Sequence, residues 1–507
     1  MGHSLFAAKP IHLFEEEMKD DNRLRRVLGP ISLTSLGVGA IIGAGIFVLT
    51  GMGARDHAGP ALTLSFVVAG MGCAFTALCY AEFASMLPVA GSAYTYAYAT
   101  LGEFVAWIIG WDLIIEYSMA SAAVAVGWSG YLLKLLALFH IKLPFWLAND
   151  YFTAKAMLAS NSPLLAGFSD LTIPTVLGIP VAFNLPAMLV ILVITAILVK
   201  GIRESAGFNA TMVAIKLVVV LFVIFVGSFY VDTKNWTPFM PMGWMGMFAG
   251  AGYIFFAYIG FDSVSTHAEE AINPRRDVPI GIIASLAICT VLYIAVAAVM
   301  TGMEHYSRID ISAPIASAFV AKGLSVAVFI ISIAAVAGIT SVLLVLMLSQ
   351  PRVFLAMARD GLLPRSVFGT VHPRFRTPHR ATMLMGAVVS LVAALTPIED
   401  IAKLVNIGTL LAFVIVCAAV WVMRHTHPER PRPFRCPWVP VVPLLGIVFC
   451  LGLMFFLGWV NWLRLFVWLA IGVVIYFAYG RRHSVLAQPR ATTTTVVAAA
   501  DQPRTLP

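Results

Sequence analysis

The sequence predicts an all-α protein that crosses a membrane twelve times. Of its 507 residues, 60% are apolar and 11% are charged, whereas a soluble domain has about 45–50% apolar and about 25% charged residues. The apolar residues gather in continuous stretches of the length that a helix needs to cross the hydrocarbon core, about 20 residues. Two of these stretches, the first and the sixth, are interrupted by glycine. The composition excludes a soluble globular protein and a disordered chain, and six cysteines in a chain of this length exclude a disulfide scaffold.

The predicted spans follow one another with short polar connections. The first six are Ile31–Thr50, Leu62–Leu87, Val105–Leu133, Ala182–Val199, Thr211–Phe229 and Met245–His267. The other six are Ile280–Met300, Ala313–Leu348, Ala381–Leu395, Leu404–Met423, Val439–Leu457 and Leu465–Tyr479. Continuous apolar runs of this length exclude an outer-membrane barrel, whose strands alternate over about 10 residues.

Charge placement predicts the orientation of the chain. If residues 1–30 form a cytoplasmic N-terminal segment, most of the 33 Lys and Arg residues fall in cytoplasmic segments, as the positive-inside rule requires. The net charge of +8 is then a topology signal and implies no nucleic-acid partner. We expect a twelve-helix transporter domain over residues 31–480 and a disordered cytoplasmic tail over 481–507. Both termini are expected in the cytoplasm and the protein in the plasma (inner) membrane; the role of the external segment 134–179 stays open.

The first span is unusually rich in glycine. It holds Gly37, Gly39, Gly43 and Gly45 within nine residues, and each glycine costs about 1 kcal/mol relative to alanine in a helix interior. Close helix packing through Gly39 and Gly43 is one explanation. The other is a helix that unwinds in mid-membrane, which is tolerated where the freed backbone lines a cavity or meets a ligand.

The sixth span repeats this feature at the corresponding place in the chain. In Phe255-Phe-Ala-Tyr-Ile-Gly-Phe-Asp-Ser263, a glycine flanked by aromatic residues precedes a carboxylate. Broken helices at corresponding positions of two halves are typical of an inverted-repeat transporter with its binding site near the bilayer midplane. We therefore expect helices 1 and 6 to be broken and to form the site together.

A broken helix favours a dipolar ligand. The second half of such a helix offers N–H groups to an anion, and the first half offers C=O groups to a cation. An α-amino acid has both charges. With Gly43 inside the first break, the predicted carboxylate contacts are the amides of Ala44, Gly45 and Ile46, and the predicted ammonium contacts are the carbonyls of Ile41, Phe256, Ala257 and Ile259.

Several motifs resemble the amino acid–polyamine–organocation superfamily, and most closely its bacterial cationic amino acid transporter family. The motifs are Gly39-Ala-Ile-Ile-Gly-Ala-Gly-Ile-Phe47, Tyr80-Ala-Glu-Phe-Ala-Ser-Met-Leu-Pro-Val-Ala-Gly-Ser-Ala-Tyr94, Gly201-Ile-Arg-Glu-Ser205, Phe255–Asp262, Glu269-Glu-Ala-Ile-Asn-Pro274 and Met357-Ala-Arg-Asp-Gly-Leu-Leu-Pro364. The resemblance implies five-plus-five inverted repeats with two added helices, and uptake of L-amino acids by alternating access. It also implies the backbone contacts named above. Many relatives have a hydroxyl residue where Ala44 stands, so a side-chain bond to the carboxylate is absent here.

Lys216 lies inside the fifth apolar span. A charge at mid-helix costs about 2.5–3.5 kcal/mol on insertion scales, so it is a functional candidate. One interpretation is snorkelling of the side chain towards the cytoplasmic interface. The other is a titratable cation that loses and regains a proton during transport. The resemblance implies that this lysine substitutes for a coupling sodium ion, which predicts a proton-coupled, sodium-independent symporter.

Three acidic residues also lie within spans. Asp112 and Glu116 are spaced i,i+4 and share one helix face, and the resemblance places Glu116 and Asp262 near the substrate side chain. Both favour a cationic side chain or proton movement. The alternative interpretation of each of the three is a hydrogen-bonded structural carboxylate. The resemblance also points Ile339 into the pocket, where a β-branched side chain favours small substrates. Cationic and small neutral substrates therefore stay open.

Other function classes lack their signatures. The sequence has no HExxH motif and no nucleophile–base pair, so an enzyme is not predicted, and we expect no cofactor and no metal. A channel would present a repeated filter segment, but the two interrupted spans differ. An amino acid or organic-amine exchanger and a non-transporting solute sensor remain alternatives to a symporter, and the oligomeric state is left open.

Overall fold

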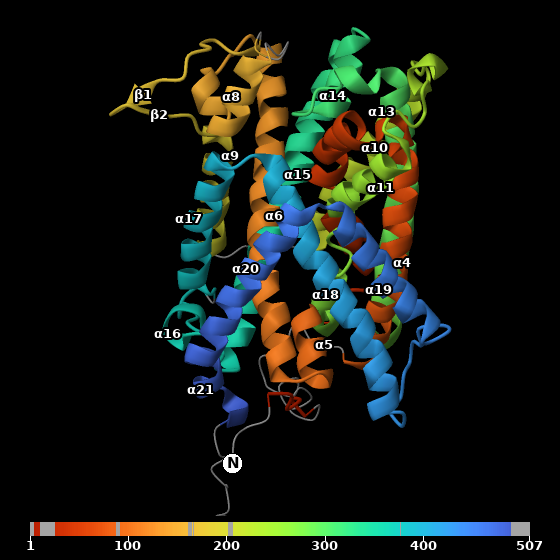
Figure 1. Cartoon of the computed structure of the whole chain (residues 1–507), viewed down its shortest axis with the longest axis vertical. Coiled ribbons are helices and arrows are strands. Elements are labelled where there is room, and N and C mark those ends of the chain that lie inside the picture. Colours follow the sequence, from red (N-terminus) through yellow and green to blue (C-terminus); the bar gives the residue numbers. More distant parts are fainter. Residues whose placement is uncertain are drawn as a thin grey trace, which may run out of the picture.

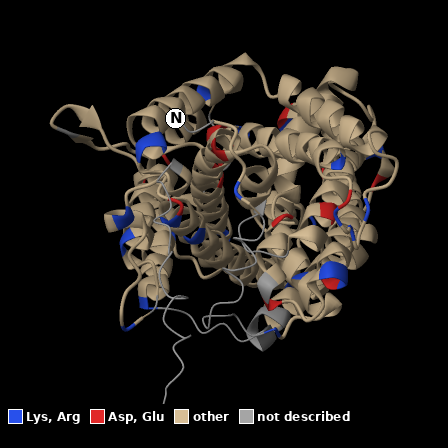
Figure 2. Cartoon of the chain, turned by 90° about the horizontal axis from the view of Figure 1, so that it is seen from below, with Lys and Arg blue, Asp and Glu red and all other residues tan. Residues whose placement is uncertain are grey.

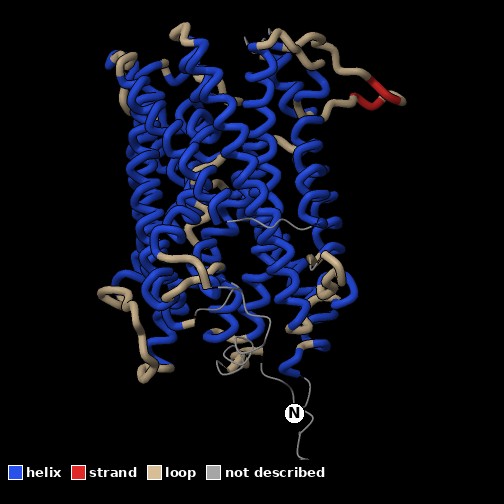
Figure 3. Tube along the Cα trace, turned by 180° about the vertical axis from the view of Figure 1, so that it is seen from behind, coloured by secondary structure: helices blue, strands red, loops and turns tan. Residues whose placement is uncertain are grey.

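The computed structural model of the protein describes residues 5–10, 26–87, 92–160, 165, 167–200, 206–375 and 377–487. These residues are nearly all helical, and the helices run mostly along one long axis (Figures 1 and 3). The sheet that they contain is one hairpin of β1 (Thr175–Val176) and β2 (Ile179–Pro180). Its two turn residues, Leu177 and Gly178, both have positive φ, which matches the twist of a two-residue hairpin turn.

The part of the chain before the second interruption supplies the first half of the bundle. Its helices are α2 (Pro30–Ile41), η1 (Gly45–Leu49), α3 (Thr50–Met52), η2 (Gly53–Ala58), η3 (Gly59–Ala61), α4 (Leu62–Met86), α5 (Ser92–Thr100), α6 (Glu103–Leu138), α7 (Phe145–Ala148), α8 (Tyr151–Ala159), α9 (Leu185–Lys200), α10 (Ala206–Ser228) and η5 (Thr233–Trp236).

The second half begins with the other interrupted helix. Its helices are α11 (Gly243–Ile254), η6 (Phe255–Tyr258), α12 (Ser263–Thr266), η7 (Ala268–Glu270), α13 (Pro274–Met303), η8 (Tyr306–Arg308), α14 (Pro314–Ala321), α15 (Ser325–Arg359), α16 (Arg365–Phe368), α17 (His379–Leu395), α18 (Ile398–Thr426), α19 (Val441–Phe456), α20 (Trp459–Ile475), η9 (Tyr476–Gly480), α21 (Arg481–His483) and η10 (Val485–Ala487).

Length and hydropathy make this a polytopic membrane protein. Within the described ranges, eight helical stretches are long and apolar enough to cross a bilayer, and α9, α17 and α19 are shorter apolar helices. The eighth predicted span, Ala313–Leu348, is wrong as one helix. It is divided into α14 and α15 at a turn where Gly323 has a φ of +72°, a conformation that a side chain disfavours.

The two halves of the chain interleave in one bundle. Helix α13 lies along both α4 and α2, and α15 and α18 both lie along α6. In Figure 1 the orange α6 crosses the middle of the bundle between later helices. Helices from both halves therefore form the interior, and a site at its centre contains residues from each half.

The two ends of the bundle carry different small elements. Helices α5, α16 and α21 lie at the end marked N in Figure 1, and α8, α14 and the hairpin lie at the other end. Figure 2 looks at the first of these ends and shows Lys and Arg (blue) and Asp and Glu (red) at scattered positions on a ribbon that is mostly tan, the colour of all other residues. The Gly201–Ser205 motif and residues 488–507 of the predicted tail fall outside the described residues. The described part of that tail, residues 481–487, contains α21 and η10.

Both terminal segments reach the start of α6. The backbone N–H of Glu103 donates to the Ala7 carbonyl, 3.1 Å away, and the hydroxyl of Ser484 donates to the Glu103 carboxylate. Asp360, which directly follows α15, pairs with Lys9 at 3.2 Å and accepts from the Tyr94 hydroxyl at 2.7 Å. The buried Glu103 is thus a structural residue that joins Ala7 and Ser484 to the bundle.

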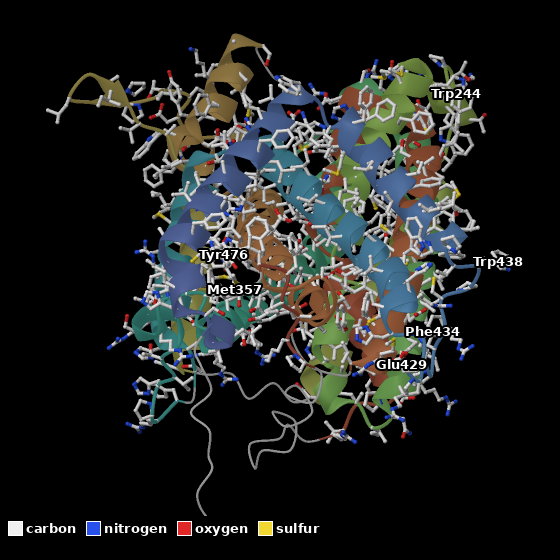
Figure 4. All side chains as sticks on the ribbon, turned by 60° about the horizontal axis from the view of Figure 1, so that its bottom comes forward. Trp244, Met357, Glu429, Phe434, Trp438 and Tyr476 are labelled. Atoms are coloured by element: carbon white, nitrogen blue, oxygen red, sulfur yellow. The ribbon has the colours of Figure 1, made fainter. Side chains whose placement is uncertain are left out.

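A second polar cluster joins α4 to the segment after α18. The Glu82 carboxylate accepts from Arg424 at 2.6 Å and from the Cys436 backbone N–H at 2.7 Å, and its other oxygen lies 3.3 Å from Arg432. In Figure 4 the labelled side chains Glu429, Phe434 and Trp438 mark this segment at the edge of the bundle. Glu82 is therefore an anchor for a surface segment.

Candidate functional site

The first interruption lies in the middle of the first helical stretch. Helix α2 ends at Ile41, and Ile42 takes an extended conformation (φ −73°, ψ 96°). Helical backbone resumes at Ala44, directly before the wider turn η1. Every residue from Gly37 to Leu49 is buried. The end of a helix leaves carbonyl groups without intrahelical partners, and the start of a helix leaves N–H groups without them. Both kinds of group therefore meet inside the bundle.

The second interruption has the same character. Helix α11 ends at Ile254, a 3₁₀ turn covers Phe255–Tyr258, and Ile259 is extended (φ −59°, ψ 133°) before Gly260 at a φ of +120°. The N–H of Gly260 donates to the Asp262 carboxylate at 3.2 Å, which fixes this carboxylate against its own loop. Short 3₁₀ and π segments inside membrane helices often mark functional positions.

Glycine lets the two interruptions touch. A Cβ at Gly260 would lie 2.9 Å from the carbonyl carbon of Ala40, and one at Gly45 would overlap the Cα of Ala257. Any side chain at either position would push the two backbones apart. The glycines of the first span therefore serve close approach to the second interruption, as well as the change of backbone direction.

Two adjoining cavities lie around these interruptions. The first is lined by Ala40, Ile41, Gly43, Ala44, Gly45, Ala120, Val124, Phe256, Ile259, Val342 and Leu346. The second shares Ala40, Ile259, Val342 and Leu346 with it and adds Glu116, Tyr117, Gly260, Asp262, Ser263, Val345 and Ser349. The first cavity thus combines backbone from both interruptions with apolar walls, and the second adds two carboxylates.

Most of the predicted site residues meet here. Ile41, Gly43, Ala44, Gly45, Phe256 and Ile259 line the first cavity, and Glu116 and Asp262 line the second. The other three, Ile46, Ala257 and Ile339, are buried but do not line either cavity. Val342, three residues after Ile339 on α15, lines both.

Lys216 reaches the end of α2 from α10. Its Nζ donates to the Gly39 carbonyl at 2.8 Å, and the side chain is fully buried. A Cβ at Gly338 would lie 3.1 Å from the Cγ of Lys216, so the absence of a side chain on α15 makes room for the lysine stem. The ammonium group therefore points at the interrupted helix, and the side chain does not snorkel to the interface.

Tyr293 on α13 also bonds to the first interruption, and the sequence did not single it out. Its hydroxyl donates to the Ile41 carbonyl at 2.8 Å, and the ring is fully buried. Lys216 and Tyr293 thus hold two carbonyls at the end of α2. A hydroxyl within a long apolar helix was the available signal, but Tyr293 is one of 14 tyrosines in the chain, and many of them are buried.

The acidic residues are not all alike in their surroundings. Asp112 lies against α18, where a Cβ at Gly408 would be 2.7 Å from its Oδ1, and it lines neither cavity. Neither Asp112 oxygen, nor Oε2 of Glu116, has a hydrogen-bond partner among the described residues. The described part of the chain also contains no group of three or more His, Cys, Asp or Glu side chains that could bind a metal.

Asn406 on α18 also escaped the sequence analysis. Its Nδ2 donates to the carbonyls of Gly252 at 2.9 Å and Tyr253 at 2.7 Å, directly before the second interruption. It is a polar side chain within the predicted span Leu404–Met423, the same kind of position that marks Lys216 as a candidate.

Comparison with known proteins gives the family. A sequence model described as amino acid permease matches residues 28–478. The branched-chain amino acid permease BcaP of Bacillus subtilis is 48% identical over 96% of this chain and 100% of its own length. A methylthioribose transporter of the same organism is 45% identical over 95% of this chain and 99% of its own. A vacuolar cationic amino acid transporter of Arabidopsis thaliana is 39% identical over 81% of this chain and 62% of its own.

Since the family model covers nearly all of the bundle, this chain belongs to the amino acid permease family of the amino acid–polyamine–organocation superfamily and is a membrane transporter, not an enzyme.

Proposed function

We propose that this protein takes up L-amino acids across the plasma membrane as a proton-coupled symporter that works by alternating access. The observation that carries the proposal is the contact between two interrupted helices, whose backbones line one buried cavity. Such a site suits a ligand that needs N–H donors at one end and carbonyl acceptors at the other.

The backbone groups define the proposed binding mode. The substrate carboxylate accepts from the amides of Ala44, Gly45 and Ile46, where the helix resumes after Gly43. The ammonium group donates to the carbonyls of Ile41, Phe256, Ala257 and Ile259. The Ile41 carbonyl already accepts from Tyr293, and its second lone pair remains for the substrate. A solute without these two charged groups would leave this backbone unsatisfied, which is costly in a buried site.

The walls of the first cavity favour a neutral aliphatic side chain. Val124, Phe256, Val342 and Leu346 present apolar surface next to the backbone groups, and burial of such a side chain contributes about 0.8 kcal/mol per CH₂. A 48% identical relative is named a branched-chain amino acid permease, in agreement with this preference. We therefore propose branched-chain or other small neutral amino acids as the first substrates to test.

A cationic substrate is the second candidate, because Glu116 and Asp262 line the adjoining cavity. A long basic side chain that passes Ile259 would place its charge near both carboxylates. Other relatives are named cationic amino acid transporters. A third relative is named a methylthioribose transporter, so a thiosugar belongs in the same test.

Lys216 is the proposed proton-coupling residue. Its ammonium group holds the Gly39 carbonyl at the end of α2, so loss of its proton would weaken that bond and free the half-helix to move. With the Lys216 ammonium group in the place of a coupling ion, transport needs no sodium. The bond between Lys216 and Gly39 links the protonation state of the lysine to the interrupted helix that binds the substrate.

The proposed architecture has twelve crossings. The first apolar stretch, Pro30–Met86, has 57 residues, and at 1.5 Å per residue it would be far longer than the roughly 30 Å hydrocarbon core. It turns at Gly59, which has a φ of +62°, so it accounts for two crossings. With α14 and α15 in one crossing and the three shorter helices included, we propose twelve crossings in five-plus-five inverted repeats with two added helices, both termini being cytoplasmic.

Reconstitution in liposomes tests the function. We expect counterflow uptake of labelled L-leucine or L-valine, competition by L-amino acids but not by decarboxylated amines, and accumulation under an inward pH gradient without sodium. Competition by L-arginine or methylthioribose would identify the other substrate classes. Counterflow without net accumulation would identify an exchanger, and binding without counterflow would identify a solute sensor.

A further inference from the structure

Helix α18 donates two side-chain hydrogen bonds to the end of α11. The fully buried Asn406 donates through Nδ2 to the carbonyls of Gly252 and Tyr253, at 2.9 and 2.7 Å. In a continuous α-helix these two carbonyls would accept from the N–H groups of Phe256 and Ala257. Those residues belong to the 3₁₀ turn η6 instead. Asn406 therefore supplies donors at the place where the helix changes its hydrogen-bond pattern.

The same helix holds the far side of the interruption. The ring of Phe413 contacts the rings of Phe255 and Phe261, with centroid distances of 5.6 and 5.1 Å. Asn406 and Phe413 are seven residues apart, which is two turns, so they share one face of α18. One helix thus spans the interruption, with the Asn406 amide before it and the Phe413 ring against residues on both of its sides.

The amide chemistry at position 406 is specific. A carboxamide has two N–H donors on one nitrogen, and here they meet two carbonyl oxygens. An aspartate of the same shape would present acceptors to acceptors, and a leucine would leave both carbonyls without a side-chain donor. Each buried polar group left unsatisfied costs about 1–3 kcal/mol.

We propose that Asn406 is a positioning residue for the substrate amino group. By fixing the last carbonyls of α11, it sets the direction of the carbonyls of Phe256, Ala257 and Ile259 that follow. This inference rests on the proposed function, since it assigns Asn406 to the ammonium end of the amino acid site. Asn406 itself lines neither cavity and acts through the backbone of η6.

Asn461 on α20 provides a matched control. It is 4% exposed, and its Nδ2 donates to the Leu457 carbonyl at 2.7 Å, directly after α19. Both asparagines therefore bond to carbonyls at a helix end, but only Asn406 does so at an interruption that lines the cavity. The variants are Asn406→Asp, Asn406→Leu, Asn461→Asp and Asn461→Leu.

The experiment measures KM and maximal rate for labelled L-leucine in proteoliposomes, per folded transporter. Loss of one or two buried hydrogen bonds predicts a rise in KM of about tenfold or more for the Asn406 variants. The Asn461 variants keep the KM of the parent within about twofold, even where their thermal midpoint falls. A merely structural role would lower the yield and thermal midpoint of the Asn406 variants without raising KM, and that result would overturn the proposal.

A competition assay keeps the proposal testable if uptake by the Asn406 variants is weak. The parent protein should bind L-leucine far better than its α-hydroxy analogue, which lacks the ammonium group, and Asn406→Asp should reduce this preference. An unchanged preference in the variant would contradict the positioning role. A parent protein that binds neither these two compounds nor L-arginine would instead contradict the proposed function, so the two failures are distinguishable.

Discussion

The Nζ atom of Lys216 lies 2.8 Å from the carbonyl oxygen of Gly39, two residues before α2 ends. The buried ammonium group of Lys216 thus holds the end of α2 at Gly39. The substrate ammonium is expected to approach the same helix end two residues further on, at Ile41. Tyr293 holds the Ile41 carbonyl itself. The interrupted helix is therefore fixed by side-chain donors from α10 and α13, both of which also lie against α2.

Lys216→Ala should remove concentrative uptake. Without the ammonium group no proton can be gained or lost at the end of α2, so accumulation of labelled substrate under a pH gradient should fall to the level without a gradient. Counterflow should persist, because it needs substrate binding and no net proton movement. Lys216→Met, which keeps the stem that contacts Gly338, should behave in the same way.

Lys234→Met is the control, since this lysine is exposed on η5 outside the bundle, and it should accumulate substrate normally. Normal proton-driven accumulation by a folded Lys216→Ala protein would end the coupling hypothesis.

Tyr293→Phe should raise KM with little loss of stability. The change removes one neutral hydrogen bond, worth about 1 kcal/mol, from a carbonyl that we expect to bind the substrate. This corresponds to a KM rise of about fivefold. Tyr476→Phe is the comparison, because its hydroxyl is also buried and donates to Glu103 at 2.9 Å, at the end of the bundle that carries α21. An equal rise in KM in both variants would show that the Tyr293 effect is not local.

Gly45→Ala should separate the two interruptions. Its new Cβ would overlap the Cα of Ala257, whose nitrogen would lie only 3.1 Å away, and such overpacking costs about 1–3 kcal/mol. We expect a lower thermal midpoint and loss of substrate binding. At Gly452 on α19 a Cβ would meet nothing within 4 Å, so Gly452→Ala should be neutral or slightly stabilising. Wild-type binding by Gly45→Ala would mean that the close approach is not needed.

The sequence could predict the interruptions because they depend on local residue types. Glycine clusters at Gly43–Gly45 and at Gly260 stand out against long apolar helices, and the backbone groups that they free do not depend on distant partners. The prediction of one eighth span followed the apolar length of the stretch alone. It overlooked Lys322 and Gly323, which lie within the stretch and mark the turn between α14 and α15.

The partners of the interruptions depend on contacts that no local pattern shows. Tyr293 and Ile41 are 252 residues apart in the chain, and Asn406 and Gly252 are 154 apart. Helix periodicity gives the face that a residue shares but not its height along the axis. Ile339 and Val342 lie within one turn of α15, yet Val342 lines both cavities and Ile339 lines neither.

Glu82→Gln should destabilise the protein without altering substrate affinity. The Glu82 side chain is 2% exposed and lies against Arg432, which is 4% exposed, and against Arg424. Removal of one partner leaves buried arginine charge uncompensated, at a cost of about 3–5 kcal/mol for fully buried pairs, and the partly exposed Arg424 reduces this cost.

The Glu399–Lys403 pair is the control, because Glu399 is 43% exposed and an exposed pair contributes about 0–1 kcal/mol. Thermal unfolding in detergent should therefore show a clear decrease in the midpoint for Glu82→Gln and almost no decrease for Glu399→Gln. The KM should stay at the parent value in both variants. Equal midpoints for the two variants would contradict the anchoring role of Glu82, and a raised KM in Glu82→Gln would show that the surface segment after α18 communicates with the cavity.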